Sequence, residues 1–229
     1  MIDVHSHILP LVDDGSPSLE RSLEMLKIQI DSGVTSVIVT PHYRGDYKLP
    51  PTELEKLFND FCGRVKAEGL TVDLFLGQEI FVEENLKNLL QDKLVLSMNA
   101  TKYLLLEFSY FDEYDIAETV YEVVRQGYLP IIAHPERYVY LTVEDVLEIK
   151  SLGGLIQINA DSLFVKDVHK IKTRARKLLY SGAVDFIAGD FHNGRKYYMQ
   201  KAKRLVSKKL GRDAEYNLFY GNALKIIQG

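Results

Sequence analysis

The sequence predicts an α/β fold, a distorted (β/α)7 barrel of the TIM-like type, from three observations. Short apolar, β-branched segments alternate with amphipathic helical segments, which is typical of parallel strands joined by crossover helices. Seven strand segments can be counted, enough for an open doubly wound sheet or for a closed barrel. Side chains able to bind metal follow nearly every strand, and they can all converge only if the strands form a ring. We therefore favour the barrel.

The predicted strands are short and largely apolar. They span residues 2–5, 35–40, 72–76, 103–106, 129–133, 155–158 and 184–188. The segment 35–40 reads TSVIVT, a nearly continuous apolar run that is expected of a strand buried on both faces.

The helices are predicted from capping residues and glycine stops. Ser16 and Pro17 are expected to be the N-cap and first residue of a helix that ends at Gly33. Thr52 and Glu55 form a capping-box pattern at the start of the next helix. Further helices are expected at about 84–90, 114–126, 142–153, 167–181, 197–210 and 213–227.

Length and composition bound the class of protein. With 229 residues, 46% of them hydrophobic, the chain can bury one substantial core, and we predict a single domain over 1–229. The net charge of −4 argues against a nucleic-acid partner. No apolar run approaches a membrane span and no signal peptide precedes the first strand, so no membrane insertion is expected. The single cysteine, Cys62, fits a reducing, cytoplasmic location.

Histidines are concentrated at the ends of the predicted strands. Five of the six lie there: His5, His7, His42, His134 and His192. For the N-terminal H-x-H pair alone, solvent-facing histidines on a strand are an equally good interpretation, but the whole set is not expected by chance. Glu79 and Glu107 also lie where buried strands end, and metal binding would remove the cost of desolvating their carboxylates. The sequence therefore predicts a metal site at the strand ends.

Seven motifs, in this order, make the sequence resemble the polymerase-and-histidinol-phosphatase (PHP) superfamily. They are D-V-H-S-H (3–7), D-D-G (13–15), T-P-H-Y (40–43), G-Q-E (77–79), E-F (107–108), A-H-P-E-R-Y (133–138) and D-F-H-N (190–193). Within it, the chain length and the H-P-E-R-Y segment are similar to the bacterial metal-dependent protein-tyrosine phosphatases of capsule and exopolysaccharide operons. The resemblance covers essentially the whole chain and implies a PHP-type barrel.

The resemblance implies three clustered divalent ions. The first is held by His5, His7, Glu79 and Asp190, the second by Glu79, Glu107 and His134, and the third by Asp14, His42 and His192. All these ligands offer nitrogen or oxygen, which suits Mn, Fe or Zn, and the family suggests manganese. Asp3 is interpreted either as a residue that orients a ligand or as an ordinary aspartate at a strand end.

The charge of such a site fits phosphate chemistry. Three divalent ions, four carboxylates and a bridging hydroxide leave about one positive charge, which attracts a phosphate dianion that the hydroxide can attack in line. Arg137, three residues after His134, is placed to clamp the phosphoryl group. Arg195 is a second candidate, although the family's second arginine usually lies slightly further along, and an exposed surface role is equally compatible with its position.

These observations predict a metal-dependent phosphomonoester hydrolase. From the resemblance, the expected substrate is the phosphotyrosine tail of a membrane-associated tyrosine kinase of capsule or exopolysaccharide synthesis. A histidinol-phosphate-type small-molecule phosphatase and a non-catalytic, metal-binding regulator of the kinase are the alternatives. The basic stretch Lys201, Lys203, Arg204, Lys208 and Lys209 is interpreted as a solvated helix face or as a docking site for an acidic tail.

Overall fold

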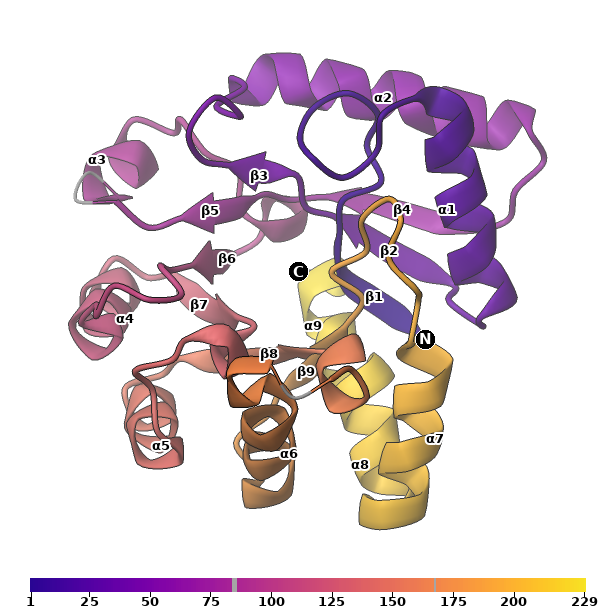
Figure 1. Cartoon of the computed structure of the whole chain (residues 1–229). Coiled ribbons are helices and arrows are strands. Elements are labelled where there is room, and N and C mark those ends of the chain that lie inside the picture. The colour runs from indigo at the N-terminus through magenta and orange to yellow at the C-terminus, as the bar shows by residue number, and fades with distance from the viewer. Residues whose placement is uncertain (84–85, 167) are drawn as a thin grey trace.

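The computed structural model describes residues 1–83, 86–166 and 168–229, and it confirms an α/β fold of parallel strands with helices on the outside (Figure 1). Its strands are β1 (Ile2–Ser6), β2 (Ser36–Val39), β3 (His42–Tyr43), β4 (Asp73–Leu76), β5 (Glu79–Phe81), β6 (Tyr103–Glu107), β7 (Leu129–Ala133), β8 (Leu155–Asn159) and β9 (Phe186–Ala188). Two predicted strands are each followed by a further short strand that was not predicted. After β2 the chain passes through Thr40 and Pro41 into β3, and after β4 it passes through Gly77 and Gln78 into β5.

The strands follow one another around a ring. One sheet has the order β1-β2-β4 and the other the order β3-β5-β6-β7-β8-β9, with parallel pairing throughout. The segment after β9 is hydrogen-bonded to β1 and to the residue that follows it, and this closes the ring. Asp190 N donates to His5 O at 2.8 Å, and His7 N donates to Phe191 O at 3.1 Å. The breaks between β2 and β3 and between β4 and β5, together with this short final link, account for the distortion of the barrel.

Helices cover the outside of the strands (Figure 1). They are α1 (Leu19–Asp31), α2 (Pro51–Ala67), α3 (Leu86–Gln91), α4 (Ile116–Arg125), α5 (Val143–Ser151), α6 (Ile171–Ser181), α7 (Met199–Leu210), α8 (Arg212–Tyr216) and α9 (Asn222–Gln228). Short turns of other helix types are η1 (Met98–Ala100), η2 (Pro135–Arg137), η3 (Asp161–Leu163), η4 (Val168–Lys170) and the π-turn η5 (Asn217–Gly221). No helix among the described residues is long and apolar enough to cross a membrane.

Several predicted helix ends are wrong. The N-cap of α1 is Ser18, whose side chain accepts a hydrogen bond from Arg21 N. The helix therefore begins two residues later than predicted from Ser16. Helix α2 begins with Pro51 at its first position and has no capping box, because proline fixes the first turn without a side-chain cap. The helix predicted over 213–227 is interrupted by the π-turn η5. The predicted starts at 84 and 167 lie outside the described residues.

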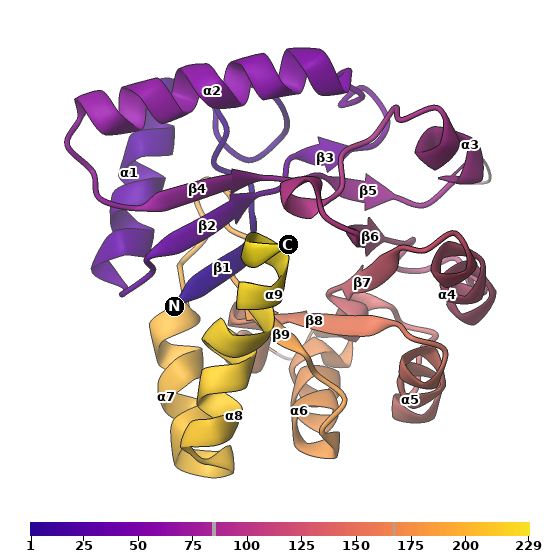
Figure 2. The same ribbon diagram turned by 180° about the vertical axis from the view of Figure 1, so that it is seen from behind.

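The N-terminal end of the ring is filled by apolar side chains, and this positions the polar end. Ile38, Leu105, Ile131 and Phe186 from four strands pack in one buried cluster with Ile226 of α9. Helix α9 lies close to β1 and the C-terminus (Figure 2), and the Asn99 side chain donates to the last carbonyls of this helix. Because this end is closed by packing, the opposite end of the strands is left for chemistry.

Candidate metal centre

The structure brings the nine predicted metal ligands together at the C-terminal ends of the strands. They lie on β1, β3, β5 and β6, within a few residues after β1, β7 and β9, and in the loop before α1. Eight of them are buried, and only the Asp14 side chain reaches solvent, at 45% exposure. Their donor atoms form four groups, each within 4.8 Å: His7–Asp14–His42–His192, His5–His7–Asp190, His5–Glu79–His134 and His42–Glu79–Glu107.

The ring nitrogens of His5 and His7 face one another in a way that favours a cation. His5 Nδ1 lies 2.8 Å from Gln157 Oε1, and His7 Nδ1 lies 2.7 Å from Asp13 Oδ2. Because carboxylate and amide oxygens only accept, both Nδ1 atoms donate, which leaves both Nε2 atoms with lone pairs when the rings are neutral. These Nε2 atoms are 3.0 Å apart. Two lone pairs at this distance are stabilised by a shared positive ion.

Glu79 occupies the middle of the cluster. Its Oε1 lies 2.8 Å from His134 Nε2, and its Oε2 lies 2.9 Å from His42 Nδ1 and 3.2 Å from the Nε2 atoms of His5 and His7. Glu79 Oε2 and His42 Nδ1 are nevertheless buried without a hydrogen bond among the described residues. Orphaned polar atoms of this kind are costly, and metal coordination satisfies them. The donor set therefore fits divalent ions, with Glu79 between them.

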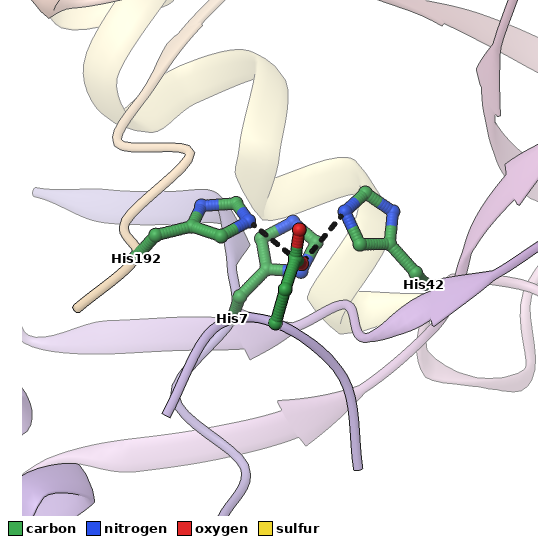
Figure 3. Close-up of side chains that lie close together, drawn as sticks. His7, His42 and His192 are labelled. Carbon is green, nitrogen blue, oxygen red and sulfur yellow. Dashed lines mark ion pairs between the residues drawn. The ribbon is translucent and has the colours of Figure 1, made fainter. Parts of the chain in front are cut away.

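Asp14 joins two histidines at the exposed side of the cluster. Its Oδ1 lies 3.4 Å from both His42 Nε2 and His192 Nε2. Figure 3 shows the rings of His7, His42 and His192 gathered around these ion pairs, and the centroid of the His7 ring is 4.1 Å from that of His192. The three residues of the third predicted ligand set therefore lie together, and His7 lies beside them.

The protonation of the metal-free cluster reflects its burial and its charges. Burial acts to lower the pKa of His5, but the charge and hydrogen bond of Glu79 raise it to about 9. His42 shows the same opposition, and its pKa rises to about 10. Burial and the neighbouring Glu79 raise the pKa of Glu107 to about 7. In the metal-free chain, protons on His5 and His42 thus balance the charge of Glu79, and a bound cation must displace them.

Residues behind the ligands fix their orientation, and sequence patterns did not identify their roles. Asp13 holds His7 and also accepts from His42 N at 3.0 Å. Position 15 requires glycine, because a Cβ there would lie 2.1 Å from His7 O. Asn159 donates from Nδ2 to Asp190 Oδ2 at 2.6 Å. The D-D-G motif and the polar end of β8 were the available signals, but only the folded chain shows which ligand each side chain supports.

Asp3 joins the first and last strands. Its Oδ1 accepts from Gly189 N at 2.8 Å, and its Oδ2 accepts from Tyr197 OH at 2.7 Å and from Gln29 Nε2 at 3.0 Å. Asp3 belongs to none of the four donor groups of the described residues. These contacts hold the backbone segments that lead to His5 and to Asp190 next to one another.

Three arginines lie at the cluster. Nη2 of Arg137 and Nη1 of Arg195 lie 3.3 Å and 3.0 Å from Asp190 Oδ2. The Arg137 guanidinium also lies 6.0 Å from the centre of the Tyr110 ring. Arg44, which the sequence reasoning missed, reaches Glu107 Oε2 at 3.2 Å and Asp14 Oδ2 at 3.3 Å. Its place two residues after a predicted ligand was the only signal for it.

A ring of parallel strands with histidines and carboxylates at its C-terminal end defines the class of metal-dependent hydrolases. The chain belongs to the CpsB/CapC family of capsular polysaccharide synthesis, whose family model matches residues 1–228. It is 32% identical to the tyrosine-protein phosphatase YwqE of Bacillus subtilis, over 95% of this chain and 88% of that protein. It is also 32% identical to the tyrosine-protein phosphatase CpsB of Streptococcus agalactiae, over 100% of this chain and 98% of that protein.

A solved structure extends this similarity to three dimensions. It comes from work on YwqE from Bacillus subtilis and CpsB from Streptococcus pneumoniae, described as unique metal-dependent tyrosine phosphatases. That chain superimposes with a TM-score of 0.92 and 30% sequence identity, over 100% of this chain and 94% of the other. The predicted resemblance to this branch of phosphatases is confirmed.

Proposed function

We propose that this protein is a metal-dependent tyrosine phosphatase that hydrolyses phosphomonoesters. The observation that carries the proposal is the buried cluster around Glu79. Its facing imidazoles and a carboxylate oxygen without a hydrogen bond among the described residues would be stabilised by bound cations. The named phosphatase relatives, which align over almost the whole chain, support the same activity. Residues 1–229 would act as one catalytic domain in the cytoplasm.

We assign the ligands to three ions, which we expect to be manganese. His5, His7, Glu79 and Asp190 would hold the first, Glu79, Glu107 and His134 the second, and Asp14, His42 and His192 the third. The four donor groups support this assignment, as does the 3.9 Å between His134 Nε2 and Glu107 Oε1. When bound, such ions act as Lewis acids on phosphoryl oxygens and lower the pKa of water.

The protein's own residues bind and orient the phosphate ester. Arg137 and Arg195 present guanidinium groups on one side of Asp190, where they can donate to phosphoryl oxygens as negative charge develops. Tyr110 donates to Glu107 Oε1 at 2.9 Å, and its ring lies edge-on to that of His134. An aryl ester entering the mouth would therefore meet an aromatic side chain beside the arginines.

The physiological partner that we propose is the phosphotyrosine tail of a membrane-associated tyrosine kinase. The capsular polysaccharide synthesis family to which the chain belongs supports this choice. Direct comparison of substrates tests it. Phosphate release should give the highest kcat/KM for a tyrosine-phosphorylated peptide, compared with histidinol phosphate and single-stranded DNA. A preference for histidinol phosphate would favour the small-molecule alternative, and no release by metal-loaded protein from any substrate would favour the non-catalytic regulator.

The thiol provides a matched control for this experiment. Cys62 lies on the outer helix α2, and burial raises the pKa of its thiol, which disfavours the nucleophilic thiolate. Cys62→Ser should therefore change turnover by less than about twofold, since surface substitutions of this kind are nearly neutral. A large loss in this variant would point to thiol chemistry instead.

A further inference from the structure

A groove of about 730 Å³ lies between α5 and α6, away from the donor cluster. These helices follow β7 and β8 and lie side by side in both views (Figures 1 and 2). Pro135, Val139, Val143 and Leu178 contribute an apolar lining, and Val139 is 41% exposed. The groove therefore keeps apolar surface in contact with water, as binding sites for other molecules do.

Positive charge surrounds this apolar lining. Among the residues that the structure describes, four cationic side chains line the groove against one carboxylate, although the whole chain carries a net charge of −4. The cations are Lys170, Arg174, Arg176 and Lys177, and the carboxylate is that of Glu144. Lys170, Arg176 and Lys177 are exposed and form no ion pair within the described part of the chain. Such a surface complements a ligand that is both acidic and apolar.

The groove and the metal centre share the short turn η2. Pro135 of this turn lines the groove, and the residue before it is the ligand His134. Arg174 Nε donates to Glu136 O at 2.8 Å, which fixes α6 against the same turn. Arg137, the last residue of η2, points instead to Asp190. The lining of the groove thus comes within one position of a metal ligand along the chain, at Pro135.

We propose that the α5–α6 groove docks an acidic peptide segment with apolar side chains that flanks the phosphotyrosine of the substrate. This deepens the proposed function and rests on it. The apolar lining holds leucine-like or aromatic side chains, and the cations hold carboxylates. Rim charges act mainly on encounter and on ground-state binding, so the groove should affect KM more than kcat.

The test compares two phosphotyrosine peptides, one flanked on both sides by Glu and Leu and one with Gln in place of Glu. The variant is Lys170→Glu/Lys177→Glu, and neither residue belongs to the metal centre. We expect its kcat/KM for the Glu peptide to fall about tenfold, mostly through KM, which corresponds to about 1.4 kcal/mol. Turnover of a small aryl phosphate should stay within about twofold, and added salt should reduce the difference between the peptides.

Lys208→Glu/Lys209→Glu provides the matched control. These exposed lysines lie in the last turn of α7, and their reversal changes the net charge of the protein by the same amount. The control should leave the preference for the Glu peptide intact. An equal loss of kcat/KM for the Glu peptide in both double variants would contradict docking in the groove. It would point instead to a general effect of charge, or to docking on the basic face of α7. Equal kcat/KM for the Glu and Gln peptides with the unchanged protein would also overturn the proposal.

Binding without catalysis separates this proposal from the proposed function. A labelled Glu and Leu peptide with Phe in place of phosphotyrosine should bind the unchanged protein and lose affinity about tenfold for Lys170→Glu/Lys177→Glu. If this peptide binds but no phosphotyrosine peptide is hydrolysed, the proposed function fails and the groove stands. If phosphotyrosine peptides are hydrolysed without any dependence on the groove lysines, the docking proposal is overturned and the proposed function stands. Competition by single-stranded DNA equal to that by the Glu peptide would indicate an unspecific anion surface.

Discussion

Glu79→Ala is expected to remove more than one equivalent of bound metal per chain and to lower turnover by about 1,000-fold, or about 4 kcal/mol. The reason is the position of this carboxylate, which lies within 3.2 Å of ring nitrogens from His5, His7, His42 and His134. One carboxylate that faces four imidazoles can serve more than one ion. Elemental analysis of the metal-reconstituted variant measures the loss directly.

Two further variants make this result interpretable. Asp14→Ala should lose about one equivalent, because the histidines with which Asp14 forms ion pairs in the described part of the chain are His42 and His192, and because its side chain is partly exposed. Glu79→Gln keeps the volume of the side chain and removes its charge, so it separates loss of metal from creation of a cavity. Equal single losses in Glu79→Ala and Asp14→Ala would contradict the bridging position of Glu79.

Arg137→Ala is expected to lower kcat/KM for phosphotyrosine peptides about 30- to 1,000-fold while the metal content stays unchanged. This range corresponds to about 2–4 kcal/mol for a charge-assisted contact that strengthens as the phosphoryl oxygens gain charge. Only 18% of the side chain is exposed, and its Nε has no hydrogen-bond partner among the described residues. Asp190 keeps Asn159 and Arg195 as partners, so its orientation should survive. Kinetics normalised to metal content give the measurement.

The conservative variant sharpens this result. Arg137→Lys should recover little activity, because a point charge cannot reproduce the fork of the guanidinium. Arg195→Ala should cost less, since the Arg195 side chain is 40% exposed and its contacts are screened by solvent. If Arg137→Ala loses metal or thermal stability but keeps turnover within threefold per metal-loaded molecule, the arginine only supports Asp190.

The strands and the ligand positions could be predicted because they depend on local signals. Buried parallel strands are continuous apolar runs, and in a barrel their C-terminal ends meet at one mouth. His134 and Asp190 stood out for this reason. Both adopt the left-handed backbone conformation, with φ values of 34° and 44°, as the chain turns sharply from strand to site. This strain was not visible in the sequence, and it is typical of functional positions.

The remainder depends on contacts between distant segments. Arg44 reaches Glu107 across 63 positions of sequence, and Asp3 reaches Gly189 across 186, so no local pattern announces either contact. The N-cap of α1 is Ser18 and not the predicted Ser16, because Ser16 instead accepts a hydrogen bond from the Ser22 hydroxyl. The α5–α6 groove likewise exists only when two helices from separate units pack together.

Phosphate release from a tyrosine-phosphorylated peptide by metal-stripped protein, before and after Mn²⁺ is added back, tests the central claim most directly. The donor cluster leaves buried oxygen and nitrogen atoms unsatisfied without cations, so we expect release to fall to the uncatalysed background after chelation. Release should then recover in proportion to the metal bound per chain. Full turnover by protein in which elemental analysis detects no divalent metal would contradict a metal-dependent phosphatase.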